Sequence, residues 1–144
     1  MEKIILTWDD IIKDCRTLAS QLECKKMLLP ITRGGLHIAG FLSQMLNIRD
    51  IRTIGISCYT DDDKQGSIKL GHMTQIDDAN LHPHECLVVD DILDSGNTLT
   101  IVDALWMYND VPTAVLYDKG ISDFKPNHVG RVIENKWVVF PWEI

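Results

Sequence analysis

The sequence lacks a long hydrophobic run, a paired-cysteine motif and an excess of positive charge. No apolar stretch approaches the roughly 18 residues that a membrane-spanning helix requires, so we expect no membrane span. The four cysteines are scattered without CxxC spacing, which disfavours a disulfide framework. With 14 Lys and Arg against 21 Asp and Glu, the net charge is −7. This charge disfavours nonspecific nucleic-acid binding, which depends on cationic side chains that neutralise phosphates.

Internal repeats, low-complexity tracts and linker-like segments are also absent. The chain of 144 residues is therefore expected to form a single domain, residues 1–144. The start of the sequence, Met1-Glu2-Lys3-Ile4, has no signal-peptide pattern, which favours a cytoplasmic location. The cysteines of a cytoplasmic protein are expected to be reduced and mostly buried. They are Cys15, Cys24, Cys58 and Cys86.

One continuous segment carries the most informative pattern. The short apolar run Leu87–Val89 is typical of a buried parallel strand, and it ends in two adjacent carboxylates, Asp90 and Asp91. A small polar turn over residues 94–98 follows, and an apolar-periodic helix is expected after it. Ligands of parallel α/β sheets bind at the carboxyl ends of the strands. The segment therefore predicts a phosphate-binding site at the edge of a sheet.

The residue types of the turn suit a phosphate group. The first N–H groups of a helix lack partners within the helix, and the helix dipole favours negative charge there. Ser95 and Thr98 add hydroxyl donors, and Gly96 permits close approach of the backbone. An ordinary strand end followed by an ordinary helix cap is the simpler alternative for such a turn.

The neighbouring carboxylates need a separate explanation, because they would repel a phosphate. They are explained if the ligand also carries hydroxyl groups and a metal ion. Asp90 and Asp91 are predicted to accept hydrogen bonds from a vicinal diol, directly or through water bound to Mg²⁺. Asp94, at the mouth of the turn, is a candidate proton acceptor.

A second anion-binding segment is Arg33-Gly34-Gly35. It follows an expected strand at residues 27–31 and precedes an expected helix at residues 36–46. The glycine pair leaves backbone N–H groups accessible, and arginine offers forked donors to phosphate oxygens. Taken alone, the triplet is explained equally well by a helix start beside a surface arginine. Together with the first segment, it predicts a second phosphate site at the same edge.

The remaining periodicities alternate between strands and helices, which predicts an α/β fold with a central, mainly parallel sheet flanked by helices. A polar, glycine-containing stretch over residues 60–73 is predicted to be a loop or lid. Thr7 is the expected N-cap of the first helix, with Asp10 three residues further on. The other expected elements are helices at 8–24 and 99–108, strands at 51–59 and 113–117, and a tail with short apolar runs at 131–133 and 137–142.

The segment Cys86–Thr98 resembles the signature of type I phosphoribosyltransferases that binds phosphoribosyl pyrophosphate (PRPP). That signature has four apolar residues, two acids, two apolar residues and then Asp-Ser/Thr-Gly-x-Thr. Three other segments extend the similarity toward the bacterial xanthine-guanine enzymes: Pro30–Leu36, Ser57–Tyr59 and Trp137–Glu143. The chain departs from those enzymes at Val138, at Glu143 and in the lid sequence. The resemblance implies the type I fold, with a small hood and a flexible lid loop.

The resemblance also implies an activity: transfer of the phosphoribosyl group from PRPP to a 6-oxopurine, with Mg²⁺ as cofactor and release of pyrophosphate. A homo-oligomer, dimer or tetramer, is expected on the same ground, as is a non-proline cis peptide at Thr32–Arg33. The resemblance implies that pyrophosphate binds at Arg33, Gly34 and Gly35, and that the ribose and water-bridged Mg²⁺ bind at Asp90 and Asp91. It implies that the 5′-phosphate binds at Ser95, Gly96, Asn97 and Thr98, and that Asp94 takes part in proton transfer. The purine is expected to contact Lys119, Trp137 and the backbone of Val138.

Several alternatives remain open at this stage. Lys119 is also explained as a solvated lysine after a strand, and Trp137 as a core aromatic. His82 and His84 before Cys86 form a possible zinc pattern, although a surface turn is the preferred interpretation. The rival functions are a phosphoribosyltransferase for another base and a non-catalytic regulator that binds nucleotide or RNA. The retained Asp94, the glycine pair and the long expected lid argue against the regulator.

Overall fold

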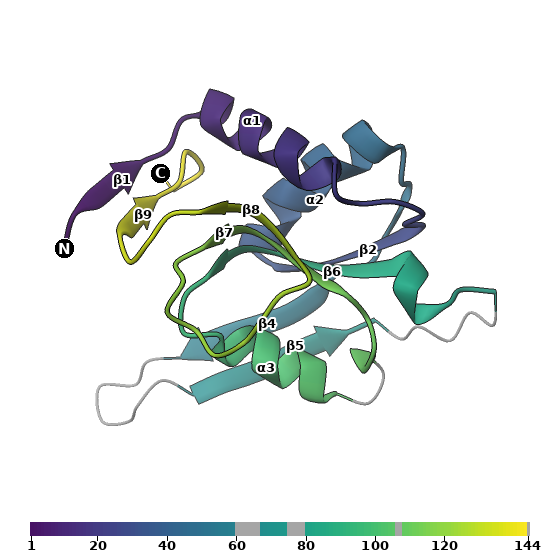
Figure 1. Ribbon diagram of the computed structural model, residues 1–144. Helices are drawn as coiled ribbons and strands as arrows, with labels where there is room; N and C mark the ends of the chain where they lie inside the picture. Colours follow the sequence, from purple (N-terminus) through teal and green to yellow (C-terminus); the bar gives the residue numbers. More distant parts are fainter. Residues whose placement is uncertain (60–66, 75–79, 106–107, 144) are drawn as a thin grey trace.

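The computed structural model describes residues 1–59, 67–74, 80–105 and 108–143 (Figure 1). Its helices and strands follow one another along the chain. They are β1 (Lys3–Ile5), α1 (Trp8–Ala19), β2 (Met27–Thr32), α2 (Gly34–Leu46), β3 (Asp50–Ile51), β4 (Ile54–Tyr59), β5 (Ser67–Met73), a 3₁₀ turn (Pro83–Glu85), β6 (Cys86–Leu93), α3 (Asn97–Ala104), β7 (Thr113–Asp118), β8 (His128–Val132) and β9 (Trp137–Val139).

The main sheet has the strand order β5-β4-β2-β6-β7-β8, and β3 also pairs with β2. All of these pairings are parallel except the antiparallel pair β4–β5. Helices α1 and α2 cover one face of the sheet and α3 covers the other (Figure 1). The predicted α/β class with a mainly parallel sheet is therefore confirmed. β1 and β9 form a separate two-stranded ribbon, which we call the hood.

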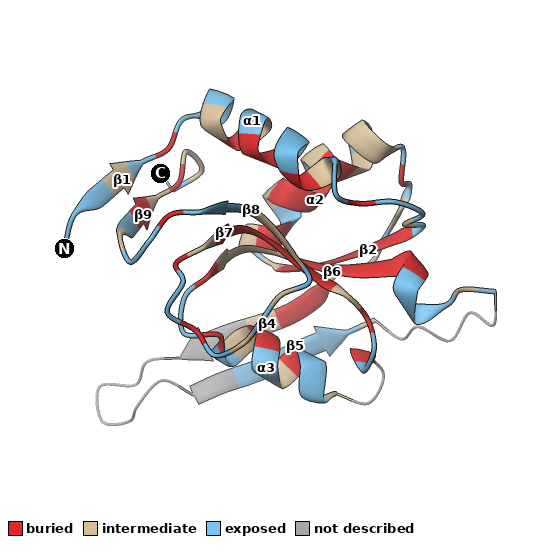
Figure 2. Ribbon diagram, in the orientation of Figure 1, coloured by how far each residue is buried: buried red, intermediate tan, exposed pale blue. Residues whose placement is uncertain are grey.

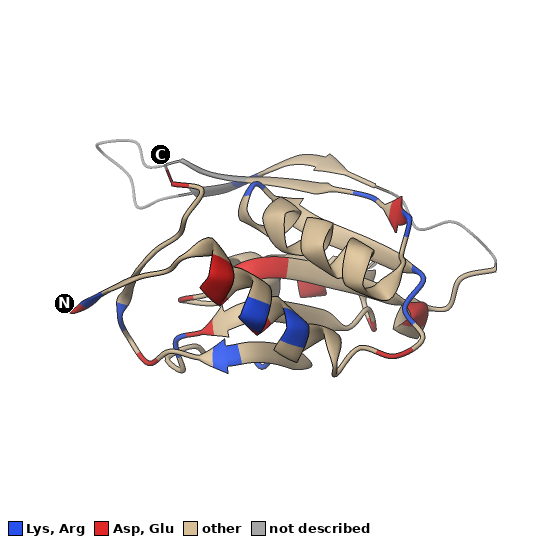
Figure 3. Cartoon of the chain, turned by 90° about the horizontal axis from the view of Figure 1, so that it is seen from above, with Lys and Arg blue, Asp and Glu red and all other residues tan. Residues whose placement is uncertain are grey.

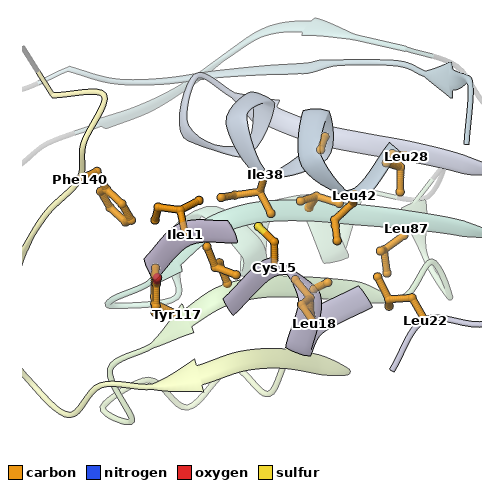
Figure 4. Packing of buried hydrophobic residues seen from close by; sticks show 14 of the residues in the cluster. Ile11, Cys15, Leu18, Leu22, Leu28, Ile38, Leu42, Leu87, Tyr117 and Phe140 are labelled. Atoms are coloured by element: carbon orange, nitrogen blue, oxygen red, sulfur yellow. The ribbon is translucent and has the colours of Figure 1, made fainter. Parts of the chain in front are cut away.

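The core lies in two layers, one on each face of the central strands. The larger layer packs Ile11 and Leu18 of α1 and Leu42 of α2 against β6, where Leu87 is fully buried (Figure 4). The second layer lies beneath α3. Figure 2 shows that the buried residues concentrate along the central strands and the inner helix faces. Burying these apolar side chains on both faces holds the carboxyl ends of the parallel strands in fixed positions.

Pro30 lies inside the central strand β2, where a residue without an N–H group is normally excluded. β2 pairs with β3 at residues 27–28 and with β4 at residues 31–32, so Pro30 falls between the two partners on that side. On its other side it pairs with Val89 of β6. The N–H donor that Pro30 lacks would therefore lie at the gap between β3 and β4, where β2 pairs with neither strand.

Helix α1 begins as predicted and ends earlier than predicted. Thr7 and Asp10 form a capping box, with Asp10 N–H donating to Thr7 Oγ1 at 3.2 Å and Thr7 N–H donating to Asp10 Oδ2 at 2.8 Å. The predicted end at residue 24 is wrong, because the helix stops at Ala19. The chain then turns, and Cys24 adopts the left-handed region at φ 58°.

The expected lid is also only partly a loop. Ser67–Met73 forms β5, which pairs with β4, so the prediction of a loop across residues 60–73 is wrong for its second half. Residues 60–66 lie outside the described part of the chain. The strand expected at 51–59 is divided into β3 and β4. Helix α3 spans Asn97–Ala104 rather than 99–108, and β1 was not predicted.

A buried polar contact fixes the end of β7 against helix α1 and strand β8. The Tyr117 hydroxyl donates to Asp14 Oδ2 at 2.6 Å, and Arg131 Nε lies 3.3 Å from the same oxygen. Burial, together with the neighbouring Asp14 carboxylate, raises the pKa of Tyr117, so its phenol stays protonated and donates. The strand that leads to Lys119 is therefore held by a satisfied polar group as well as by the apolar core.

Basic and acidic residues are interspersed over much of the chain (Figure 3), but the stretch from Glu85 to Asp118, which carries the acid pair, contains no Lys or Arg. No helix in the described ranges is both long enough and apolar enough to cross a bilayer.

Candidate active site

Three loops meet at the carboxyl edge of the sheet, because β2, β6 and β7 are parallel neighbours. The loop after β2 carries Arg33, the loop after β6 carries Asp94, and the loop after β7 carries Lys119. The two anion-binding segments predicted from the sequence therefore face the same edge, as expected.

The loop after β6 encloses a small cavity of about 80 Å³ that opens at the start of α3. Gly96 takes the left-handed conformation at φ 86°, and a Cβ there would overlap Ser122 Oγ. Gly96 is the N-cap of α3, and Ser95 Oγ accepts a hydrogen bond from Asn97 N–H at 3.3 Å, which leaves the Ser95 hydroxyl proton available. The cavity is lined by Asp90, Ile92, Leu93, Asp94, Ser95, Gly96, Asn97, Thr98 and Leu99.

The glycine pair of the other loop brings α2 against β6. A Cβ at Gly35 would overlap the backbone oxygen of Val89, and a Cβ at Gly34 would overlap the carboxylate of Asp91. The glycines therefore serve close packing as well as access to N–H groups. The peptide bond Thr32–Arg33 is cis, as the resemblance implied.

The adjacent acids lie inside β6, which continues to Leu93 beyond the end at the acids that the sequence predicted; they are half-buried and line different cavities. Asp90 lines the small first cavity. Asp91 lines a second cavity of about 680 Å³, together with Arg33, Gly34, His37, Trp142 and Glu143. The dipeptide therefore stands between the two loops that the sequence predicts to bind phosphate groups.

Burial raises the pKa of both acids. Desolvation is the main cause at Asp90, and the negative charge of Asp91 adds to it. Desolvation also dominates at Asp91 and outweighs the backbone donation from Ile92 N–H at 2.8 Å. Keeping two neighbouring carboxylates charged here lowers the stability of the folded protein. A bound cation or a ligand that donates hydroxyl groups would reduce this destabilisation.

This donor set fits Mg²⁺, which binds proteins through one or two carboxylates together with water and substrate oxygens. The described residues contain no cluster of three or more His, Cys, Asp or Glu suited to a metal. His82 and His84 stack with their ring centroids 5.3 Å apart beside the 3₁₀ turn Pro83–Glu85. The preferred surface-turn interpretation of that segment agrees with this arrangement.

Lys119 and Asp94 form an ion pair across two loops, with Nζ and Oδ2 3.2 Å apart. The Lys119 side chain is only 7% exposed, whereas the Asp94 side chain is 60% exposed. The backbone N–H of Lys119 also donates to Leu93 O at 3.1 Å. The alternative of a solvated surface lysine is therefore wrong, because Lys119 is buried and held against the first loop.

Trp137 and Val138 lie in the hood and line neither of the two cavities. The Trp137 residue is 57% exposed, so the core-aromatic alternative does not apply. Trp137 N–H donates to Glu2 O, and Val139 O accepts from Leu6 N–H. Since successive residues of a strand direct their backbone groups to opposite edges, the N–H and C=O of Val138 point away from β1.

The structure adds two side chains that the sequence did not assign to the site. His37 lies one helical turn after Gly34, and its ring stacks on Trp142 with centroids 4.3 Å apart and planes at 15°. Both line the second cavity. The position of His37 three residues after Gly34 places it on the same helix face, which is the signal that could have indicated it.

A mainly parallel sheet with two glycine-containing loops on either side of a pair of acids is typical of the class of phosphoribosyltransferases. The sequence matches the phosphoribosyl transferase domain family over residues 1–144, and the chain belongs to that family.

Individual relatives and solved structures agree with this assignment. The xanthine-guanine phosphoribosyltransferase of Cereibacter sphaeroides is 30% identical over 148 residues, covering 96% of this chain and 86% of that protein. A xanthine-guanine-hypoxanthine phosphoribosyltransferase from Helicobacter pylori superposes with a TM-score of 0.84 at 26% identity, over 99% of this chain and 95% of that one. A purine phosphoribosyltransferase from Pyrococcus horikoshii gives 0.79 at 27% identity, over 100% and 96%.

The close packing of α2 on β6 predicts opposite effects for two glycine substitutions in one helix. Gly35→Ala should lower the free energy of unfolding by about 1–3 kcal/mol, because its methyl group meets a backbone oxygen that cannot rotate away. Gly40→Ala is the matched control, since nothing lies within 4 Å of its Cβ; it should be stabilising by about 0.5–1 kcal/mol. Urea unfolding measures both, and equal stability of the two variants would contradict the packing argument.

The acid pair predicts that Asp90→Asn stabilises the protein without ligand at neutral pH. Because the pKa of Asp90 is raised in the folded state, its stabilising contribution is complete below the unfolded pKa of about 4 and is lost as pH rises through the folded pKa. The advantage of the variant should therefore grow with pH, by about 2–4 °C in Tm for each kcal/mol relieved. Thermal unfolding at several pH values measures it; a Tm difference independent of pH would refute the explanation.

Proposed function

We propose that the chain transfers the 5-phosphoribosyl group of PRPP to N9 of a 6-oxopurine: xanthine, guanine or hypoxanthine. The products are the nucleoside monophosphate and pyrophosphate, so the role is purine salvage. The relatives named above carry these activities in their names. The observation that carries the proposal is the placement of Asp90 and Asp91, which are successive residues of β6 and line two different cavities. A ribose with phosphate groups at both ends matches this arrangement.

The roles of the residues follow from the charges of PRPP. The N–H groups and hydroxyls of Ser95, Gly96, Asn97 and Thr98 would bind the 5′-phosphate, and Arg33, Gly34 and Gly35 would bind the pyrophosphate. Asp90 and Asp91 would accept from the ribose hydroxyls between them. Mg²⁺, held through water by the same two acids, would neutralise charge on the pyrophosphate.

The reaction breaks the bond from ribose C1 to the pyrophosphate oxygen, which leaves with the bonding electron pair, while purine N9 forms the new bond to C1. A base that enters with its proton on N7 must lose that proton, and the exposed carboxylate of Asp94 would accept it. Holding the reactants in line and offsetting the departing charge supply most of the catalysis.

The Lys119–Asp94 pair supports the choice of a 6-oxopurine. O6 and N7–H are neighbouring atoms on one edge of such a base, and they present an acceptor beside a donor. Lys119 Nζ and Asp94 Oδ2 present the complementary donor and acceptor 3.2 Å apart. Adenine has a donor amino group in place of O6, and a pyrimidine has no N7, so both other base classes match this pair poorly.

The hood would complete the base site. Trp137, half-exposed on β9, would stack on the purine ring. The outward backbone groups of Val138 would meet the substituent at position 2.

A turnover assay with PRPP, Mg²⁺ and a panel of six purines and pyrimidines tests the proposal. We expect pyrophosphate release with 6-oxopurines and at least tenfold lower kcat/KM with adenine and with pyrimidines. Binding of purine nucleotide without turnover would refute the enzymatic proposal and favour the regulator.

Two variants in the same assay separate the roles of the pair. Lys119→Ala should raise KM for the purine more than KM for PRPP, because Lys119 is proposed to contact only the base. Asp94→Asn should lower kcat by about 10²-fold, the usual contribution of a general base. Equal losses of both substrates in Lys119→Ala would mean that the lysine is structural, and an unchanged kcat in Asp94→Asn would remove the proton-acceptor role.

A homo-oligomer, dimer or tetramer, and a cytoplasmic location are proposed from the same family resemblance. Light scattering that reports a monomer at working concentrations would refute the first of these.

A further inference from the structure

The second cavity is lined by a histidine, His37, to which the proposed reaction assigns no role. His37 lines this cavity beside Arg33, Gly34 and Asp91, and it also lines a separate cavity with Trp8 and Gln44. It lies close enough to Asp91 for its charge to oppose the rise in the Asp91 pKa that desolvation causes. The imidazole therefore lies at the end of the site where the leaving group of PRPP is expected.

The ring of His37 is held in a fixed orientation by aromatic stacking. Trp142 covers it at 4.3 Å, and Phe140 stacks on Trp142 at 4.5 Å with an interplanar angle of 10°. Stacking uses the face of an imidazole, whereas its N–H groups lie in the ring plane. Neither ring nitrogen of His37 makes a hydrogen bond among the residues that the structure describes. An oriented ring with an unused donor is therefore available to a ligand.

The charges and sizes of the two cavities favour pyrophosphate as that ligand. The second cavity, of about 680 Å³, is much larger than the first, of about 80 Å³. It also carries two carboxylates, Asp91 and Glu143, and Glu143 already accepts from Phe140 N–H at 3.1 Å. A ligand with more negative charge than a single phosphate needs donors beyond Arg33 to bind beside them.

We propose that His37 is an additional pyrophosphate-binding residue, whose ring N–H donates to the leaving group of PRPP. This inference rests on the proposed function and assigns a role to a side chain outside the phosphoribosyltransferase signature. Trp142 acts as the positioning residue, because its indole fixes the plane of the imidazole. A neutral or a charged imidazole has at least one N–H, so the contact does not require a particular protonation state.

His37→Phe tests the proposal, because it keeps an aromatic ring for Trp142 and removes the donor. We expect its affinity for magnesium pyrophosphate, measured by calorimetry without purine, to fall about tenfold or more, as for the loss of a hydrogen bond to a charged group. KM for PRPP should rise by a similar factor, while KM for the purine changes less than twofold. His37→Gln, which restores a donor, should recover part of the affinity.

Other outcomes overturn the inference. If His37→Phe binds magnesium pyrophosphate as tightly as the unmodified protein, His37 makes no such contact. If purine and PRPP lose affinity equally, or if His37→Gln is no better than His37→Phe, the ring has only a packing role. The affinity for magnesium pyrophosphate measured by calorimetry does not depend on turnover. A chain that binds magnesium pyrophosphate through His37 but uses no purine would refute the proposed function and leave this inference supported.

Discussion

The close approach of helix α2 to strand β6 is the constraint on which the rest of the site depends. Gly35 leaves room for the backbone oxygen of Val89, and Gly34 leaves room for the carboxylate of Asp91. A side chain at either position would push the helix away from the strand. Without this contact, the loop after β2 and Asp91 of β6 would not share one cavity. The glycines thus join two parts of the site that are far apart in the sequence.

The site also has a cost for the folded protein. Two adjacent carboxylates are half-buried, and their pKa values are raised mainly by desolvation. Lys119 is almost completely buried and has one carboxylate partner, which is itself largely exposed. The apolar layers on both faces of the sheet and the Asp14–Tyr117–Arg131 contact offset such unfavourable groups. The scaffold is therefore stable enough to tolerate destabilising charged groups whose positions suit a ligand.

Much of this architecture could be predicted from local sequence. The buried strands β2, β6 and β7 contain short apolar runs, Thr7 caps the start of α1, and the left-handed Asn47 caps the end of α2, as their residue types indicate. β5 could not be identified, because Ser67–Met73 is a strand only through its pairing with β4 and contains a glycine. β1 is three residues long and depends on β9, so its own periodicity carries no signal.

The candidate site could likewise be predicted only in part from the sequence. The loops were found because glycines, acids and hydroxyls occur in a fixed order along the chain. Asp90 and Asp91 are successive residues of β6, so their side chains point to opposite faces of the strand, and this alternation could have predicted that they line different cavities. His37 and Trp142 meet only through tertiary packing between α2 and the tail. The geometry of the hood relative to the acids likewise depends on contacts between distant segments.

The pairing of β1 with β9 has a consequence for biosynthesis. β1 is synthesised before β9, and the whole main sheet lies between them in the sequence. Lys3–Ile5 therefore lacks its partner until the strands that carry both loops have been made. In this order, the loops proposed to bind phosphate groups would form before the hood proposed to complete the base site.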